Sequence, residues 1–171
     1  SMSLIARERN LGTMEIISTL PLKNHEFVIG KYLAVVSLIL IGLLVTFVHF
    51  FTLISVGTNV DYGAAFCGYF GLALVGALYA SAGIFASSLT DNQVVSFIIA
   101  VFIVIVFFLM DKLLIFVPSG MAGMVQFLSV DYHLTSISRG VIDTRNLIYF
   151  GSVIGFFLFL TIQILGVRKW K

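Results

Sequence analysis

Four long apolar runs dominate the pattern of hydrophobic and polar positions along the chain. They cover residues 31–56, 64–87, 94–110 and 147–167, and short polar stretches separate them. A helix needs about 17–25 mostly apolar residues to cross the hydrocarbon core of a bilayer, and all of these runs meet that length. The pattern predicts an all-α integral membrane protein whose transmembrane domain occupies residues 31–171.

The second run differs from the others because small residues recur along it at four-residue intervals. Small side chains let helix backbones approach closely in a membrane, so we expect this helix to be buried in the bundle. The residues expected to make this packing are Gly68, Ala73, Gly76, Ala77, Ala80 and Ser81. After it, Thr90 and Gln93 have the spacing of a capping box that opens the third helix.

Residues 113–146 break the apolar pattern. Pro118 divides two apolar pieces, and neither piece is long enough to cross a bilayer. Short interfacial or re-entrant helices on the outer side of the membrane are expected here. Asp131, His133 and Asp143 carry metal-ligand side chains, but their spacing is loose, so no metal site is expected.

Residues 1–30 carry too many charges to lie in hydrocarbon. Between Leu11 and Leu20 apolar residues nevertheless recur at roughly helical spacing, and Pro21 ends or kinks that helix. A short amphipathic helix before a membrane span can lie on the lipid surface or dock against a protein. The residues alone leave both alternatives open.

Composition narrows the class of protein. Hydrophobic residues make up 60% of the chain and charged residues only 11%, which excludes an ordinary soluble domain. The net charge of +2 and the lack of a basic patch interleaved with aromatics indicate no nucleic-acid partner. The one cysteine, Cys67, cannot form a disulfide within the chain.

Nucleotide-binding and catalytic motifs are missing from the sequence. The only Gly-Lys pair, Gly30-Lys31, is followed by Tyr32 where a P-loop needs Ser or Thr. No nucleophile elbow, zinc-protease motif or Cys/His cluster occurs either. The chain is therefore not expected to be an enzyme or to hold a cofactor.

Three groups of residues in the same order carry a family resemblance. The first group contains Met2, Arg7-Glu8-Arg9, Gly12-Thr13, Glu15, Pro21, Glu26 and Gly30-Lys31. The second contains Ser87-Ser88-Leu89-Thr90 with Asn92-Gln93. The third contains Arg139-Gly140-Val141-Ile142-Asp143 with Tyr149-Phe150. The chain resembles ABC-2 type transporter permeases over nearly its whole length. Within that family it is most similar to the gliding-associated and copper-enzyme-maturation permeases.

The resemblance implies a six-helix bundle of which this chain contains four helices, so the chain resembles a fragment without the first two spans. It implies that residues 1–30 form a cytosolic coupling segment that docks on a separate ATPase subunit, which binds ATP and Mg. The chain would then be the permease subunit of an exporter, paired with a second permease copy. The interface residues implied are Arg7, Glu8, Arg9, Gly12, Thr13 and Glu15.

Two other functions compete with this interpretation. One is a non-transport scaffold with four spans, whose amphipathic arm only lies on lipid. The other is an intramembrane enzyme, which is the weakest because no span carries paired polar groups beyond His49. A neutral histidine packed against neighbouring helices explains His49 more simply than a ligand or proton-relay role.

The uneven distribution of Lys and Arg residues predicts how the chain is oriented in the cell membrane, which is the inner membrane. With the N-terminus in the cytoplasm, seven Lys and Arg residues lie inside and three lie outside, which favours this topology. Four spans return the chain to the same side, so both termini are expected to be cytoplasmic. The outer cations are Lys112, Arg139 and Arg145.

Single cysteines test the orientation. With Cys67 replaced by serine, a cysteine at Thr58 should react with a membrane-impermeant reagent in intact cells, whereas a cysteine at Ser3 should not. Labelling at Ser3 without labelling at Thr58 would show that the chain has the opposite orientation in the membrane.

Overall fold

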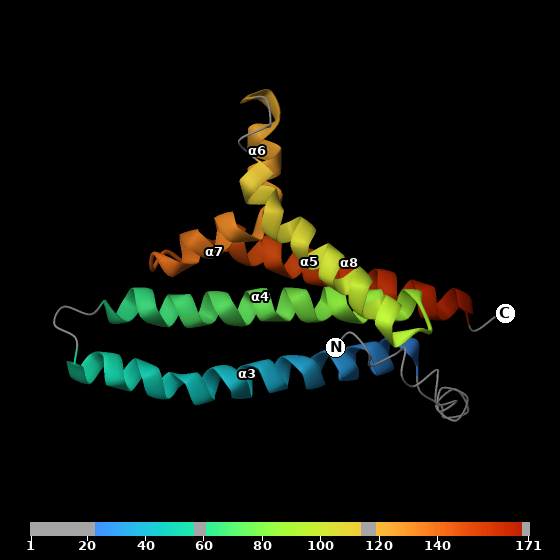
Figure 1. Cartoon of the computed structure of the whole chain (residues 1–171), viewed down its shortest axis with the longest axis horizontal. Coiled ribbons are helices and arrows are strands. Elements are labelled where there is room, and N and C mark those ends of the chain that lie inside the picture. Colours follow the sequence, from blue (N-terminus) through green and yellow to red (C-terminus); the bar gives the residue numbers. More distant parts are fainter. Residues whose placement is uncertain (1–22, 57–60, 114–118, 169–171) are drawn as a thin grey trace. The chain divides into compact units, whose positions relative to one another are not determined.

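The computed structural model describes residues 23–56, 61–113 and 119–168. Within these ranges every regular element is a helix, and Figure 1 shows the helices labelled along the chain. They are α3 (Asn24–Val56), α4 (Tyr62–Leu89), α5 (Gln93–Leu113), α6 (Ser119–Leu128), α7 (Val130–Ser138) and α8 (Thr144–Arg168).

The helices α3, α4, α5 and α8 are each long and apolar enough to cross a membrane. The predicted all-α membrane fold is therefore confirmed. The short helices α6 and α7 occupy the interrupted segment between α5 and α8. One boundary differs from expectation, because α3 begins at Asn24 and runs unbroken into the apolar run that starts at Lys31.

Polar side chains just before the first turn determine where the helices begin. Asp61 Oδ1 accepts the backbone N–H groups of Gly63 and Ala64 at 2.9 and 3.1 Å, which caps α4. Asp143 Oδ1 likewise accepts the N–H of Arg145 at 3.0 Å at the start of α8. The first N–H groups of a helix have no partner within it, so these carboxylates satisfy donors that the helix itself leaves without an acceptor.

The start of α5 corrects the expected capping box. Asn92 is the cap, because its Oδ1 accepts the N–H of Val94 at 2.9 Å and its carbonyl accepts the N–H of Ser96 at 3.0 Å. Thr90 instead accepts the N–H of Asn92 at 3.2 Å and so shapes the turn before the helix. The prediction of a capping box of Thr90 with Gln93 is wrong, because the cap lies two residues later, at Asn92. Asparagine caps a helix at least as well as threonine does.

The chain divides into two compact units, which we describe separately. The first contains described residues within Ser1–Val36, Ala77–Val104 and Gly151–Lys171. Its core is a buried cluster of Val28, Ile84 and Leu165. Around the cluster pack Phe27, Tyr32, Leu158 and Ile162. The first turns of α3 are therefore fixed to the second half of α4 and the end of α8.

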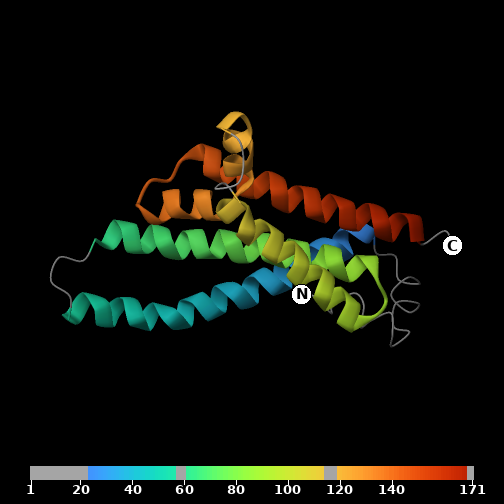
Figure 2. The ribbon, with the colours of Figure 1, turned by 45° about the horizontal axis from the view of Figure 1, so that its top comes forward.

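The second unit contains Ser37–Gly76 and described residues within Ile105–Phe150. Here the later part of α3 and the first part of α4 lie side by side and antiparallel, as Figures 1 and 2 both show. The Tyr69 hydroxyl donates to the carbonyl of Thr46 at 3.0 Å, and the Tyr69 and Phe47 rings lie 4.9 Å apart. A side-chain hydrogen bond and an aromatic contact thus join the two helices in this unit.

Two glycines of α4 mark close approaches within this unit. A Cβ atom added at Gly71 would lie 2.8 Å from Leu134 Cδ1 of α7, and one at Gly76 would lie 2.9 Å from Ile39 Cγ2 of α3. Gly68 on the same helix has no such neighbour within 4 Å. A side chain at Gly76 would meet a methyl group attached directly to a branched β-carbon of α3, next to the backbone, whereas one at Gly71 would meet the flexible end of Leu134. The absence of a side chain is therefore most important at Gly76 and is not needed at Gly68.

A pair of matched substitutions tests this packing. Gly76→Ala should lower the free energy of unfolding by about 1 kcal/mol, because a clash of about 1–3 kcal/mol exceeds the gain in helix propensity of up to about 1 kcal/mol. Gly68→Ala makes no clash and should leave stability unchanged or raise it. Thermal unfolding of the purified variants in detergent measures both, and equal midpoints for the pair would show that α3 and α4 do not pack closely at Gly76.

Candidate functional site

The residues expected to bind an ATPase subunit precede the first described helix. These residues, Arg7, Glu8, Arg9, Gly12, Thr13 and Glu15, lie outside the described part of the chain. Their role remains a prediction. The first described residue after them is Lys23, directly before α3, and its N–H donates to Oε2 of Glu26 in the first turn of the helix at 3.0 Å.

The residues expected to pack α4 lie in different surroundings. Ala77, Ala80 and Ser81 are buried, whereas Gly68 and Ala73 are half-buried. The Ser81 hydroxyl donates to the carbonyl of Leu78 at 2.7 Å, so this buried polar group is satisfied within its own helix. In the 18-residue stretch of α4 that is apolar enough to cross a membrane, 56% of the residues are buried, whereas in the corresponding stretch of α3 no residue is buried.

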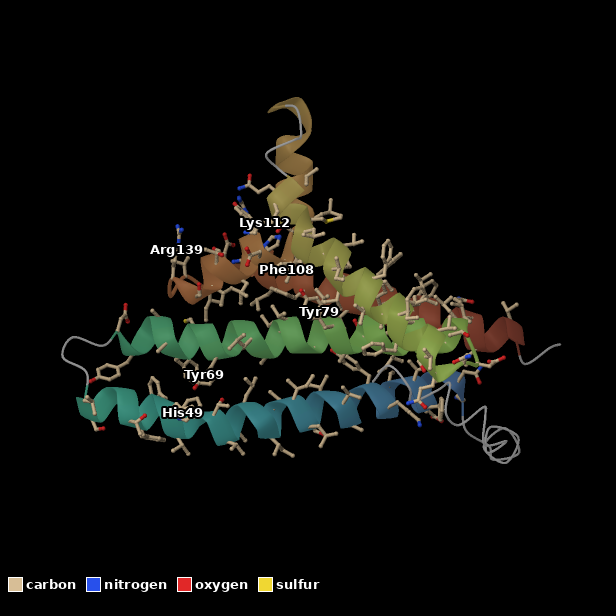
Figure 3. All side chains as sticks on the ribbon, viewed as in Figure 1. His49, Tyr69, Tyr79, Phe108, Lys112 and Arg139 are labelled. Atoms are coloured by element: carbon tan, nitrogen blue, oxygen red, sulfur yellow. The ribbon has the colours of Figure 1, made fainter. Side chains whose placement is uncertain are left out.

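The metal-ligand side chains of the interrupted segment have other partners. Asp131 pairs with Lys112 at 3.7 Å, Asp143 caps α8, and His133 bonds to a side-chain amide and a backbone carbonyl. No group of three His, Cys, Asp or Glu residues that could hold a metal occurs within the described residues. His49 lies at an exposed position of α3, and Figure 3 shows it near Tyr69 of the neighbouring helix α4.

His133 is the centre of a buried polar cluster in the second unit. Its side chain lies on α7 and is only 1% exposed. Nδ1 lies 2.7 Å from Oδ1 of Asn146, in the first turn of α8, and Nε2 lies 2.9 Å from the carbonyl oxygen of Phe127, near the end of α6. One imidazole ring therefore links three helices, α6, α7 and α8.

The cluster supplies hydrogen-bond donors to the carbonyl groups at the C-terminal end of α6. The last carbonyls of a helix have no partner within the helix, and leaving them unsatisfied in an apolar medium is costly. His133 contacts the carbonyl oxygen of Phe127, and the Tyr149 hydroxyl donates to the next carbonyl, that of Leu128, at 2.6 Å. Side chains of α7 and α8 thus cap α6 from outside.

Aromatic rings enclose the imidazole. The Tyr149 ring stacks on it with centroids 4.0 Å apart and planes inclined by 19°. The rings of Phe127 and Tyr132 meet it edge to face, with centroids 5.4 and 5.3 Å away. The rings exclude water from the polar contacts, so these hydrogen bonds are electrostatically stronger than they would be in water.

One polar atom of the cluster has no partner. Asn146 is 4% exposed, and its Nδ2 atom is buried without a hydrogen bond among the described residues. Buried amide groups in folded proteins are nearly always bonded, so this atom is an exception that requires an explanation. Sequence reasoning considered His133 only as a metal ligand and missed Asn146. The available signal was a polar residue in the first turn of an apolar span, because Asn and His side chains form hydrogen bonds between membrane helices.

The fold defines a multi-pass α-helical membrane protein without a metal cluster in its described residues. A family model described as "ABC-2 family transporter protein" matches residues 1–163. The chain therefore belongs to the ABC-2 transporter family, whose members are membrane transport components rather than catalysts. No curated protein and no solved structure matches the chain.

Family membership gives the function at a coarse level. The chain is a permease component of an ABC transporter and an integral membrane protein. Members of this family work with an ABC ATPase, often as dimers. This confirms the resemblance at the level of the family.

The capping of α6 by α8 can be tested by removing one hydroxyl. Tyr149→Phe should lower the free energy of unfolding by about 1 kcal/mol, because it removes the donor to the Leu128 carbonyl and keeps the ring stack. Tyr132→Phe is the matched control, since that side chain is 44% exposed and should tolerate the change. Thermal unfolding in detergent compares the two variants, and equal losses would mean that the Tyr149 hydroxyl does not hold α6.

Proposed function

We propose that this chain is the membrane-spanning subunit of an ATP-driven exporter of the gliding-associated or copper-enzyme-maturation type. A separate ATPase subunit docks on the segment from Arg7 to Pro21 and supplies the energy. Membership in the ABC-2 family supports this proposal, because the match begins at residue 1 and so includes that segment. It favours the transporter over a scaffold whose arm only lies on lipid.

The packing of α3 supports a mechanical role for the docking segment. The helix starts at Asn24, three residues after Pro21, and continues without a break to Val56. In its first turns Val28 is fully buried against Ile84 and Leu165. A displacement of the docking segment would thus be passed to a continuous helix whose first turns pack against α4 and α8. This is the single observation that carries the coupling proposal.

The mechanism follows from this arrangement. Closure of two ATPase subunits around ATP pushes the docking segments, and each segment shifts its α3 together with the helix ends packed on it. Rigid-body movement of this kind converts nucleotide binding into a change between inward-facing and outward-facing states. ATP and Mg lie on the ATPase, and the permease itself carries no cofactor.

The remaining partners follow from the same proposal. A second permease copy completes the transporter as a homo- or heterodimer, and lipid covers the exposed apolar surface. The protein lies in the inner membrane of the cell, and both of its termini lie in the cytoplasm. The excess of Lys and Arg residues on the cytoplasmic side favours this orientation.

Carboxylate removal in the docking segment tests the coupling role. A Glu8→Ala, Glu15→Ala double variant should release the ATPase subunit or uncouple its hydrolysis from transport. Removing one partner of a buried charge pair typically costs about 2–5 kcal/mol of binding, whereas removing a solvated charge costs little. Co-purification of the ATPase with the full-length permease, and ATPase rate in membranes, are the measurements.

Glu26→Ala is the matched control. The Glu26 carboxylate bonds to the backbone at the start of α3, so its loss should weaken the helix start and leave the ATPase bound. Unchanged co-purification and unchanged coupled transport in the double variant would count against a coupling role for Glu8 and Glu15. Loss of the ATPase from both variants would point to general misfolding of the segment.

A further inference from the structure

The two hydrogen bonds of His133 cannot both form if its ring is neutral and the Asn146 amide has its oxygen facing Nδ1. The ring nitrogens face the Oδ1 atom of Asn146 and the carbonyl oxygen of Phe127, and carbonyl oxygens only accept hydrogen bonds. A neutral imidazole has a single N–H group. Either the ring carries two protons, or the Asn146 amide is turned so that its NH2 group faces Nδ1. Oxygen and nitrogen of a side-chain amide are exchanged by this rotation with almost no change in shape.

We propose that His133 and Asn146 form a proton-coupled amide switch at the junction of α6, α7 and α8. In the neutral state the Asn146 NH2 group donates to Nδ1, and the Nε2–H group donates to the Phe127 carbonyl. Uptake of one proton from solvent forms an N–H bond at Nδ1. The amide then rotates by about half a turn, and the oxygen of Asn146 accepts from the protonated Nδ1.

The unpartnered nitrogen of Asn146 supports this switch. With the oxygen facing the ring, Nδ2 occupies a buried position that lacks an acceptor. With the amide turned, the oxygen occupies that position and lacks a donor. The same buried position thus requires an acceptor in the charged state and a donor in the neutral state. Because no partner among the described residues fixes that side of the amide, the protonation state of the ring decides which way the amide faces.

The surroundings of the ring accommodate the charge. The stacked face of Tyr149 attracts a cation, and both N–H groups of an imidazolium would make charge-assisted hydrogen bonds. Among titratable groups, Tyr132 on α7 and Tyr149 on α8 face the ring, and α6 contributes Phe127. The carboxylate of Asp131 bonds to Lys112 of α5, not to the ring (Figure 3 labels Lys112).

The switch changes one contact and keeps the other. The bond from Nε2–H to the Phe127 carbonyl exists in both states, so α6 and α7 remain joined. The bond between α7 and α8 reverses its direction with the proton. With both termini in the cytoplasm this junction lies on the outer side, where it would respond to the pH there. The inference does not depend on the coupling role of the docking segment.

The experiment follows the protonation of His133 and the orientation of Asn146 together. The 171-residue chain is labelled with ¹⁵N at histidine and asparagine side chains and observed by NMR in detergent micelles from about pH 8 to about pH 5, where histidines ordinarily change charge. His25→Gln and His49→Gln leave His133 as the only histidine of the three in the chain. Nδ1 should change from an unprotonated to a protonated nitrogen while Nε2 stays protonated. The Asn146 side-chain amide signals should shift with the same midpoint.

An isosteric variant gives a second test. Asn146→Asp replaces the amide by a carboxylate, which has oxygen acceptors only, so both ring nitrogens of His133 should remain protonated over the whole range and the transition should be lost. If this variant does not fold, the wild-type titration decides alone. Asn146 signals that stay fixed while His133 titrates would overturn the switch, as would a His133 ring that keeps one protonation state from about pH 8 to about pH 5.

Discussion

The need to satisfy backbone polar groups without water governs this structure more than any other constraint. In hydrocarbon an unpaired N–H or C=O group costs several kcal/mol, so a helix that ends away from water needs other protein groups to replace the missing partners. Long helices meet this need at few points, at caps such as Asp61 and Asn92. The short helices between α5 and α8 have proportionally more ends. That is why the densest group of side-chain hydrogen bonds described here gathers around the end of α6, with His133 and Tyr149 as donors.

Buried hydroxyls elsewhere in the chain meet the same constraint in a different way. Ser81, Ser88 and Thr161 donate to carbonyls three or four residues earlier in their own helices. Such bonds satisfy the hydroxyl without joining two helices, so they leave the helix free to shift against its neighbours. His133 and Tyr149 join different helices, and they hold their helices in one arrangement. Side-chain hydrogen bonds within one helix therefore mark the helices that can slide against their neighbours. Side-chain hydrogen bonds between two helices mark the helices that are held in place.

The sequence predicted the spans well and the polar contacts poorly, for physical reasons. Length and apolar content decide whether a helix can cross a bilayer, and both are local properties, so residues 64–87 and 147–167 were located within a few residues of α4 and α8. The cap of α5 was placed on Thr90 instead of Asn92 because several polar residues in that turn are competent caps. The sequence places a polar residue, Asn146, at the start of an apolar span, but it does not give the partner of that residue. The pairing with His133 depends on how the chain turns at Gly140, where φ is +85°. The interface residues Arg7 to Glu15 precede the described helices, so their assignment still depends on resemblance alone.

The two compact units also differ in what holds them together. The first depends on an apolar cluster, Val28 with Ile84 and Leu165, and such contacts tolerate small displacements because they have no direction. In the second, the described junction of α6, α7 and α8 depends on hydrogen bonds of fixed geometry, which either form or break. A transporter needs both kinds of contact: one that yields to a push on α3, and one that changes between discrete states. A directional bond suits regulation by a signal other than ATP, because the uptake of a single proton reverses its donor and acceptor.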